Sequence, residues 1–166
     1  MNRVRNLIIY GMCAAIVVVS KEIIAFVPGA ELVSFLLILF GINFKLKGSI
    51  IIAVVFSFLQ MVLYGVGIWT YMYFIVWTSL VVIAYCCRGI LKDEYKLAIF
   101  SGIFGLVFGF LFSIPYFVIS FRMGWIYFVK GIPFDLAHGV GNYIIMLLLY
   151  SKCNRVIVQL KERYKV

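Results

Sequence analysis

Charged residues are scarce in this sequence, and the shortage argues against an ordinary soluble domain. Only 13% of the 166 residues are charged, and 66% are hydrophobic. A soluble domain carries about 25% charged residues and about half apolar ones. A soluble core of this size cannot bury so much apolar surface, so we expect the surplus to face lipid. The length fits one domain, residues 1–166, built as an all-α membrane protein.

Histidine is scarce as well, and metal-ligand spacing is missing. The chain has one histidine and four cysteines, and the cysteines lack the spacing of a metal site, so we expect no bound metal. The sequence contains neither a phosphate-binding loop of the Gly-x4-Gly-Lys type nor a His-Glu-x-x-His motif. No pair of acid and base groups, or of nucleophile and base, is visible. We therefore expect no enzyme and no cofactor.

Apolar stretches dominate what is present. A membrane span needs roughly 17 to 25 apolar residues, and six stretches reach or approach that length, at about residues 7–27, 32–44, 48–64, 69–87, 97–120 and 134–150. We expect loops between them, including one from Arg122 to Pro133. The sequence therefore predicts a single bundle of about six transmembrane helices.

Basic residues give this bundle an orientation, because Lys and Arg are concentrated on the cytoplasmic side of membrane proteins. With the amino terminus inside, only Lys21, Arg122 and Lys130 of the 15 basic residues fall outside. This distribution predicts two cytoplasmic termini and a multi-pass protein of the cell membrane. It also explains the net charge of +9, so we expect no nucleic-acid partner.

Polar residues gather in the outer half of the last stretch. Asp135, His138 and Asn142 share one helix face at 3.6 residues per turn. Ionisable groups at membrane depth are costly and usually face a cavity or a polar partner. For Asp135 alone, an alternative is a place in the first helical turn after Pro133, where a carboxylate complements the helix dipole. That alternative does not explain the other two residues, so we expect the three to line a substrate cavity.

Further candidates for the same cavity lie at the outer ends of other stretches. They are Gln60 and Tyr64, the four-residue series Trp69, Tyr73 and Trp77, and Glu31 beside the loop after the first stretch. The alternatives are ordinary ones: Trp and Tyr anchor helices at the membrane interface, and Glu31 can belong to a solvated loop. We expect a cavity lined by the sixth, fourth and third stretches under the first loop.

Small residues mark two helix faces. Ser101, Gly105, Gly109 and Ser113 recur every four residues, which favours close packing of helices inside the bundle. Gly11 and Ala15 form a shorter face near the start of the chain. That second face can serve internal packing or dock another membrane subunit.

Taken together, the length, the expected six spans, the Gly11 and Ala15 face and the run from Gly131 to Asn142 resemble a known family. The chain resembles the substrate-binding S component of an energy-coupling factor (ECF) type ABC transporter. The run reads Gly-Ile-Pro-Phe-Asp-Leu-x-His-x-x-x-Asn, which is similar to the start of the last helix in many members. The loop from Pro28 to Glu31 also resembles the family's substrate-covering loop.

The resemblance implies a division of labour. An S component of a bacterial cell membrane captures a vitamin or similar micronutrient and joins a transmembrane coupling subunit with two ABC-type ATPases. Family members have an Ala-x-x-x-Ala face on the first helix that contacts the coupling subunit, and Gly11 and Ala15 occupy those places here. An aromatic cavity with few charges favours a flat, mostly neutral heterocycle. Cobalamin, riboflavin, folate, pantothenate, pyridoxine and queuosine-type bases all remain open.

A structural membrane protein is the alternative from another class. The rod-shape protein MreD is also short and six-spanning, and it needs no ligand. A scaffold of this kind has no use for Asp135, His138 and Asn142 on one inward face, whereas a binding protein does.

Overall fold

The computed structural model describes residues 2–26 and 31–164, and this part of the chain is helical without a strand. Its helices are α1 (Asn2–Ile24), α2 (Val33–Asn43), α3 (Leu46–Tyr64), α4 (Ile68–Cys87), α5 (Glu94–Ile119) and α6 (Phe121–Tyr164). The all-helical fold class is therefore confirmed. Five of the helices, all except α2, are long and apolar enough to cross a membrane. The count of six spans and the cytoplasmic location of both termini stay predictions.

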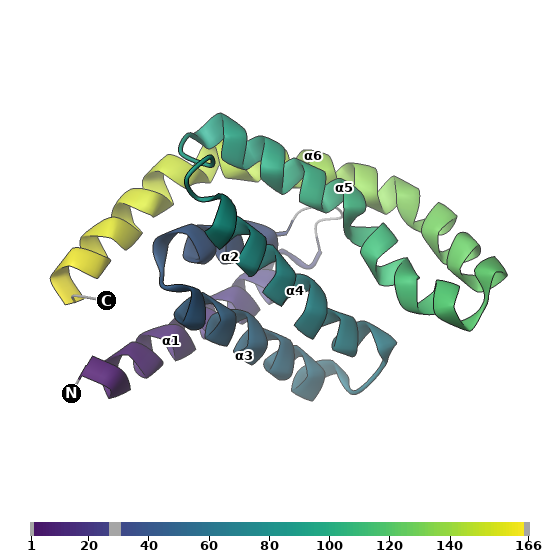
Figure 1. Cartoon of the computed structure of the whole chain (residues 1–166), viewed down its shortest axis with the longest axis horizontal. Helices are drawn as coiled ribbons and strands as arrows, with labels where there is room; N and C mark the ends of the chain where they lie inside the picture. The colour runs from purple at the N-terminus through teal and green to yellow at the C-terminus, as the bar shows by residue number, and fades with distance from the viewer. Residues whose placement is uncertain (1, 27–30, 165–166) are drawn as a thin grey trace.

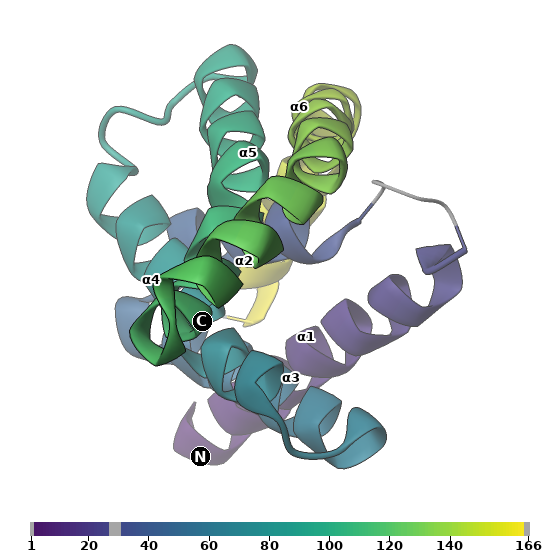
Figure 2. The same ribbon diagram turned by 90° about the vertical axis from the view of Figure 1, so that its right-hand side faces the viewer.

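The short helix α2 lies at the centre of the molecule (Figures 1 and 2). Its 11 residues rise about 16 Å, which is too little to cross a hydrocarbon core of about 30 Å. Most of its side chains are buried, and it contacts each of the other five helices. A helix that is apolar all round belongs in a core, so α2 serves as the element around which the others pack.

Helices α5 and α6 form a long antiparallel pair along one side of the molecule (Figure 1). Glycine makes the close approach possible: a Cβ atom added at Gly105 would lie 2.8 Å from the Cα atom of Gly139 on α6. The predicted small-residue face is buried at all four positions, Ser101, Gly105, Gly109 and Ser113. These residues therefore pack helices inside the fold.

The segment from Arg122 to Pro133 is helical, so the prediction of a loop there is wrong. Helix α6 begins at Phe121 and continues through Pro133 to Tyr164. Proline removes one backbone hydrogen bond and kinks a helix without having to end it, and the ribbon of α6 changes direction along its length in Figure 2. Asp135 consequently lies in the interior of α6, and the interpretation of Asp135 as a first-turn residue is also wrong.

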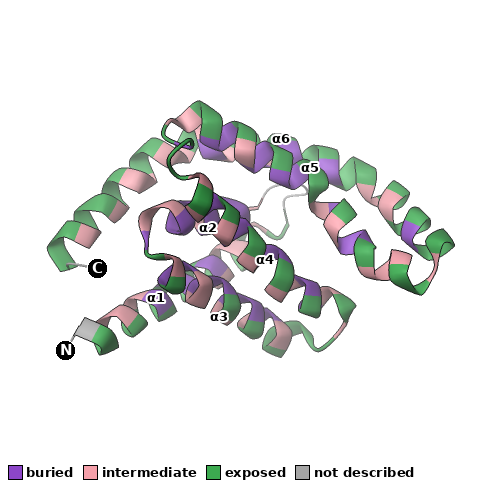
Figure 3. Cartoon of the chain, viewed as in Figure 1, coloured by how far each residue is buried: buried purple, intermediate pink, exposed green. Residues whose placement is uncertain are grey.

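Burial follows the inward sides of the helices (Figure 3). Large apolar side chains cover the outward sides, among them Ile75, Phe110, Val118 and Leu148. A soluble monomer rarely exposes such continuous apolar surface. The outer surface is therefore compatible with a multi-pass membrane protein.

Candidate functional site

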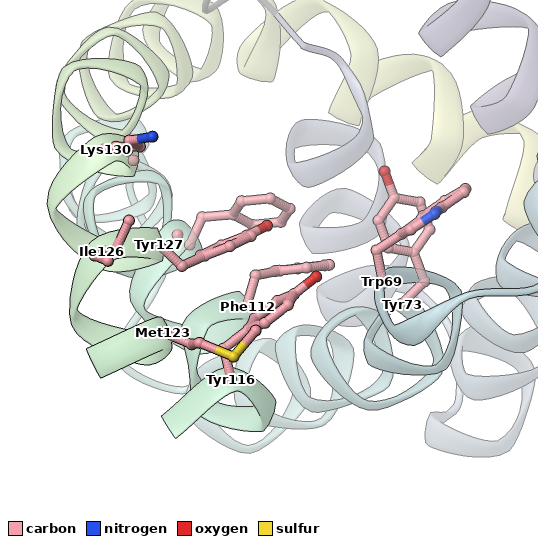
Figure 4. Close-up of a pocket in the computed structure, with 11 residues that line it drawn as sticks. Trp69, Tyr73, Phe112, Tyr116, Met123, Ile126, Tyr127 and Lys130 are labelled. Carbon is pink, nitrogen blue, oxygen red and sulfur yellow. The ribbon is translucent and has the colours of Figure 1, made fainter. Parts of the chain in front are cut away.

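A cavity of about 710 Å³ lies between the first turns of α4 and the α5–α6 pair. Its wall is mostly aromatic, and Figure 4 shows several of the rings grouped around the opening. The lining residues are Trp69 and Tyr73 of α4, Phe108, Gly109, Phe112 and Tyr116 of α5, and Met123, Ile126, Tyr127, Lys130 and Gly131 of α6. Stacked and edge-on ring pairs of this kind offer flat surfaces to a planar ligand.

Two of the three α4 aromatic candidates line this cavity. Trp69 and Tyr73 meet edge to face, with ring centroids 5.3 Å apart. The third, Trp77, is 2% exposed and packs between Phe56 and Phe104 in the core. Trp77 therefore supports the cavity from behind, and a ligand cannot stack on it in this arrangement.

The α6 candidates Asp135, His138 and Asn142 are all buried. Asp135 Oδ1 accepts a hydrogen bond of 2.9 Å from the backbone N–H of Gly109 on α5. Asn142 lies deeper along the pair, where its Nδ2 group donates to the carbonyl of Ser101 over 3.4 Å. The shared helix face thus points toward α5, and none of the three residues is on the lining of this cavity, contrary to the prediction.

His138 pairs with the candidate that precedes α2. Its Nε2 atom lies 2.9 Å from Oε1 of Glu31, and the same carboxylate accepts hydrogen bonds from the backbone N–H and the hydroxyl of Ser34. Glu31 therefore connects α2 to α6 near the cavity. Pro28 and Gly29, which belong to the predicted covering loop, lie outside the described residues.

Gln60 and Tyr64 belong to a different polar cluster, at the C-terminal end of α3. The Tyr64 hydroxyl donates to the Glu22 carboxylate of α1, and Gln60 Nε2 lies 3.5 Å from the same group. Neither residue lines the cavity. The sequence predicted walls from α6, α4 and α3, but the cavity is lined by α6, α4 and α5, so the prediction of α3 as a wall is wrong. Tyr64 touches the site indirectly, through an edge contact of 6.3 Å between its ring and that of Trp69.

Several buried polar atoms at this end of the molecule have no hydrogen-bond partner in the described part of the chain. They are Oδ2 of Asp135, Nδ1 of His138, Oδ1 of Asn142 and Oε1 of Gln60. An unsatisfied buried polar atom costs about 1 to 3 kcal/mol. Asp135 and His138 lie behind the cavity wall, beside Gly109 and Phe108, whereas Gln60 belongs to the cluster around Glu22, and none of the four residues lines the cavity. The described part of the chain contains no group of three or more metal-ligating side chains that could hold an ion.

Sequence reasoning missed most of the cavity wall. Phe108, Phe112 and Tyr116 recur every four residues, a spacing that places them on one face of α5. That spacing was the available signal for the α5 wall. Met123, Ile126, Tyr127 and Lys130 were hidden by the wrong prediction of a loop, because a loop assigns no common face to residues three or four apart.

The predicted docking face on α1 is exposed in the described structure. A Cβ atom added at Gly11 would meet nothing within 4 Å, and Ala15 is exposed. The buried side of α1, with Ala14 and Val17, packs on the rest of the bundle. Gly11 and Ala15 therefore do not serve internal packing.

Comparisons with protein-family models, with curated proteins and with solved structures find no match for this chain.

Proposed function

We propose that this chain is the substrate-binding S component of an ECF-type transporter in a bacterial cell membrane. In this proposal it captures a vitamin or related micronutrient in the cavity between α4, α5 and α6. The observation that carries the proposal is the aromatic cavity beside buried Asp135 and His138. Its volume of about 710 Å³ lies within the range of roughly 300 to 1,000 Å³ that small-molecule pockets occupy.

The role of the chain in this proposal is binding, without chemistry of its own. Aromatic rings supply stacking surfaces, and Lys130 supplies a polar group on the cavity lining. Asp135 and His138 support the wall from behind, through Gly109 and Phe108. ATP hydrolysis falls to two ABC-type ATPases, which act through a transmembrane coupling subunit. The exposed small-residue face at Gly11 and Ala15 is the surface that we assign to that subunit.

The test combines two readouts on the tagged, full-length protein. The first is a thermal-shift assay with riboflavin, folate, pantothenate, pyridoxine, cobalamin and queuine. The second is co-purification from native membranes, followed by identification of the associated subunits. We expect stabilisation by one compound, together with one membrane subunit and two ABC-type ATPases. If no compound stabilises the protein and no ATPases co-purify with it, the proposal is overturned and a scaffold such as MreD is favoured.

A further inference from the structure

We propose that the last third of α6, residues 151–164, is an amphipathic segment that binds a lipid surface carrying anionic headgroups. Such binding requires a membrane protein, but it needs neither a substrate nor a transporter, so it goes beyond the function proposed above. Three observations support it: the segment lies past the helix pair, it has an exposed apolar row, and it carries an excess of cations beside that row.

The segment extends past the end of its helix partner. Helix α6 has 44 residues, or about 66 Å, which is about twice the thickness of a hydrocarbon core. Ser151 donates a hydrogen bond of 2.6 Å to Glu94, the first residue of α5, so residues 152–164 lie beyond the α5–α6 pair. Figure 1 shows this yellow end of α6 continuing where α5 has stopped. The segment therefore begins where the predicted membrane-spanning stretch, residues 134–150, ends.

One side of the segment is held against the rest of the molecule. Asn154 Oδ1 accepts a hydrogen bond of 2.8 Å from Asn43, the last residue of α2, and Lys161 Nζ donates to the backbone carbonyl of the same asparagine. Cys153 and Ile157 are half-buried and pack on the core. These contacts fix which side of the helix faces the protein and which side is left for a partner.

An apolar row runs along the side that is left. Residues four apart are neighbours on a helix surface, and four exposed residues of the segment have this spacing: Lys152, Val156, Leu160 and Tyr164. The same spacing leads back to Ile144 and Leu148, two exposed apolar residues of the predicted span. The row thus continues the outward apolar surface that a membrane would cover. This continuity favours lipid over a soluble partner, and tyrosine is a residue that membrane interfaces favour.

The neighbouring row is polar and basic. It consists of three exposed residues, Arg155, Gln159 and Arg163. Residues 151–164 contain four basic residues and one acidic residue, and none of the four basic ones forms an ion pair in the described part of the chain. Arg88, at the end of α4, adds a cation that lies close enough to Lys161 to repel it.

This combination of rows matches an anionic membrane surface. A cluster of roughly four to eight Lys and Arg residues on an amphipathic helix beside a membrane span is typical of binding to anionic lipids. Phosphate groups of the lipids can neutralise the cations while the apolar row enters the boundary with the acyl chains. The predicted orientation also places this end of α6 at the cytoplasmic leaflet, which is the anionic one.

The test uses the full-length protein in nanodiscs of phosphatidylcholine alone and of phosphatidylcholine with about 30% phosphatidylglycerol. Hydrogen–deuterium exchange of peptides from residues 151–164 measures how strongly the segment is held. We expect exchange to slow by about tenfold with phosphatidylglycerol at about 50 mM salt. The difference should vanish at about 1 M salt, where charges are screened beyond roughly 3 Å.

Equal exchange in the two membranes at low salt would overturn the proposal. Protection that is the same in both membranes and appears only when another protein is bound would also overturn it, in favour of a protein partner.

Two triple variants separate the segment from the other cations at the same end of the molecule. The first neutralises exposed cations of the segment: Lys152→Gln, Arg155→Gln and Arg163→Gln. The second removes the same charge from exposed cations near the turns between the other helices: Lys45→Gln, Lys47→Gln and Lys92→Gln. The effect of phosphatidylglycerol on exchange should disappear in the first variant and persist in the second. Equal losses in both would overturn a specific role for this segment.

The apolar row is tested at constant charge. Val156→Gln places an amide on the row, and Val158→Gln is the matched control, because both valines are exposed but only Val156 lies on the row. We expect the slowing by phosphatidylglycerol to shrink to about threefold or less in Val156→Gln and to stay at the wild-type level in Val158→Gln. A wild-type response in Val156→Gln would overturn the amphipathic mode of binding, since cations alone would then hold the segment.

Discussion

Nε2 of His138 lies 2.9 Å from Oε1 of Glu31, although 107 positions separate the two residues in the sequence. The contact joins Glu31, two residues before the central helix α2, to the middle of α6. His138 is 2% exposed at its side chain and Glu31 is 19% exposed. The pair therefore links the core of the fold to the polar side of the cavity.

The first prediction concerns the stability of this pair. Glu31→Ala should lower the free energy of unfolding by about 1 to 3 kcal/mol, because it leaves the buried imidazole of His138 without this partner. His138→Ala should lower it by a similar amount, because it removes the same contact and a buried ring from the core. The double variant should cost little more than the worse single variant, since both changes remove one shared interaction. Thermal denaturation of the four proteins in the same detergent measures this cycle. Strictly additive losses would mean that the contact contributes nothing.

The second prediction concerns the aromatic wall. Tyr127→Ala should weaken binding of the compound that stabilises the wild-type protein by about two- to tenfold, because a lost aromatic stacking contact is worth about 0.5 to 1.5 kcal/mol. Tyr143→Ala is the matched control: both tyrosines lie on α6 and are 37% exposed, but only Tyr127 lines the cavity. Isothermal titration of both variants gives the comparison. Similar losses in the two variants would remove the α6 wall from the site.

The third prediction concerns the seam between α5 and α6. In Gly105→Ala the new methyl group would lie 2.8 Å from backbone atoms of Gly139, which cannot move aside as a side chain can. We expect destabilisation of about 1 to 3 kcal/mol from overpacking. Gly11→Ala should have the opposite sign, with a gain of up to about 1 kcal/mol, because alanine is the better helix former and nothing lies within 4 Å of its Cβ position.

Melting temperatures of the two glycine variants, measured without ligand, check the sign of each change. A Gly105→Ala protein as stable as wild type would show that the two helices can separate at low cost. The small-residue face of α5 would then be less important for the fold than its burial indicates.

The sequence predicted the helical fold and the inward face of α6 for a clear physical reason. Long apolar runs have few alternatives in lipid, because every backbone polar group must be satisfied within its own helix. Polar residues such as Asp135 and His138 stand out against that background, so their common face could be recognised from spacing alone.

The part that failed depends on information that spacing does not contain. Pro133 and the charged residues Arg122 and Lys130 are typical of a loop, yet the segment packs against α5 and stays helical. The four-residue spacing of Phe108 and Phe112 places them on one face of α5, but spacing does not decide whether that face meets lipid or a cavity, and tertiary packing does. Gly109 was predicted as a packing residue, and its contact with Asp135 appears only once the register of α5 against α6 is known.

The last prediction separates assembly from substrate capture. Gly11→Trp places a large side chain on the exposed face of α1, where nothing lies within 4 Å of the Cβ position, so the fold and the ligand affinity should be preserved. If the coupling subunit docks there, as proposed, the amount that co-purifies should fall by about tenfold or more, which corresponds to roughly 1.4 kcal/mol of docking energy. Ile16→Trp is the matched control, because Ile16 is 50% exposed and lies about 100° around the helix from Ala15. Loss of the subunit in both variants would indicate a general effect of bulk on α1. Loss of ligand binding in Gly11→Trp would mean that this face supports the cavity and is not a docking surface.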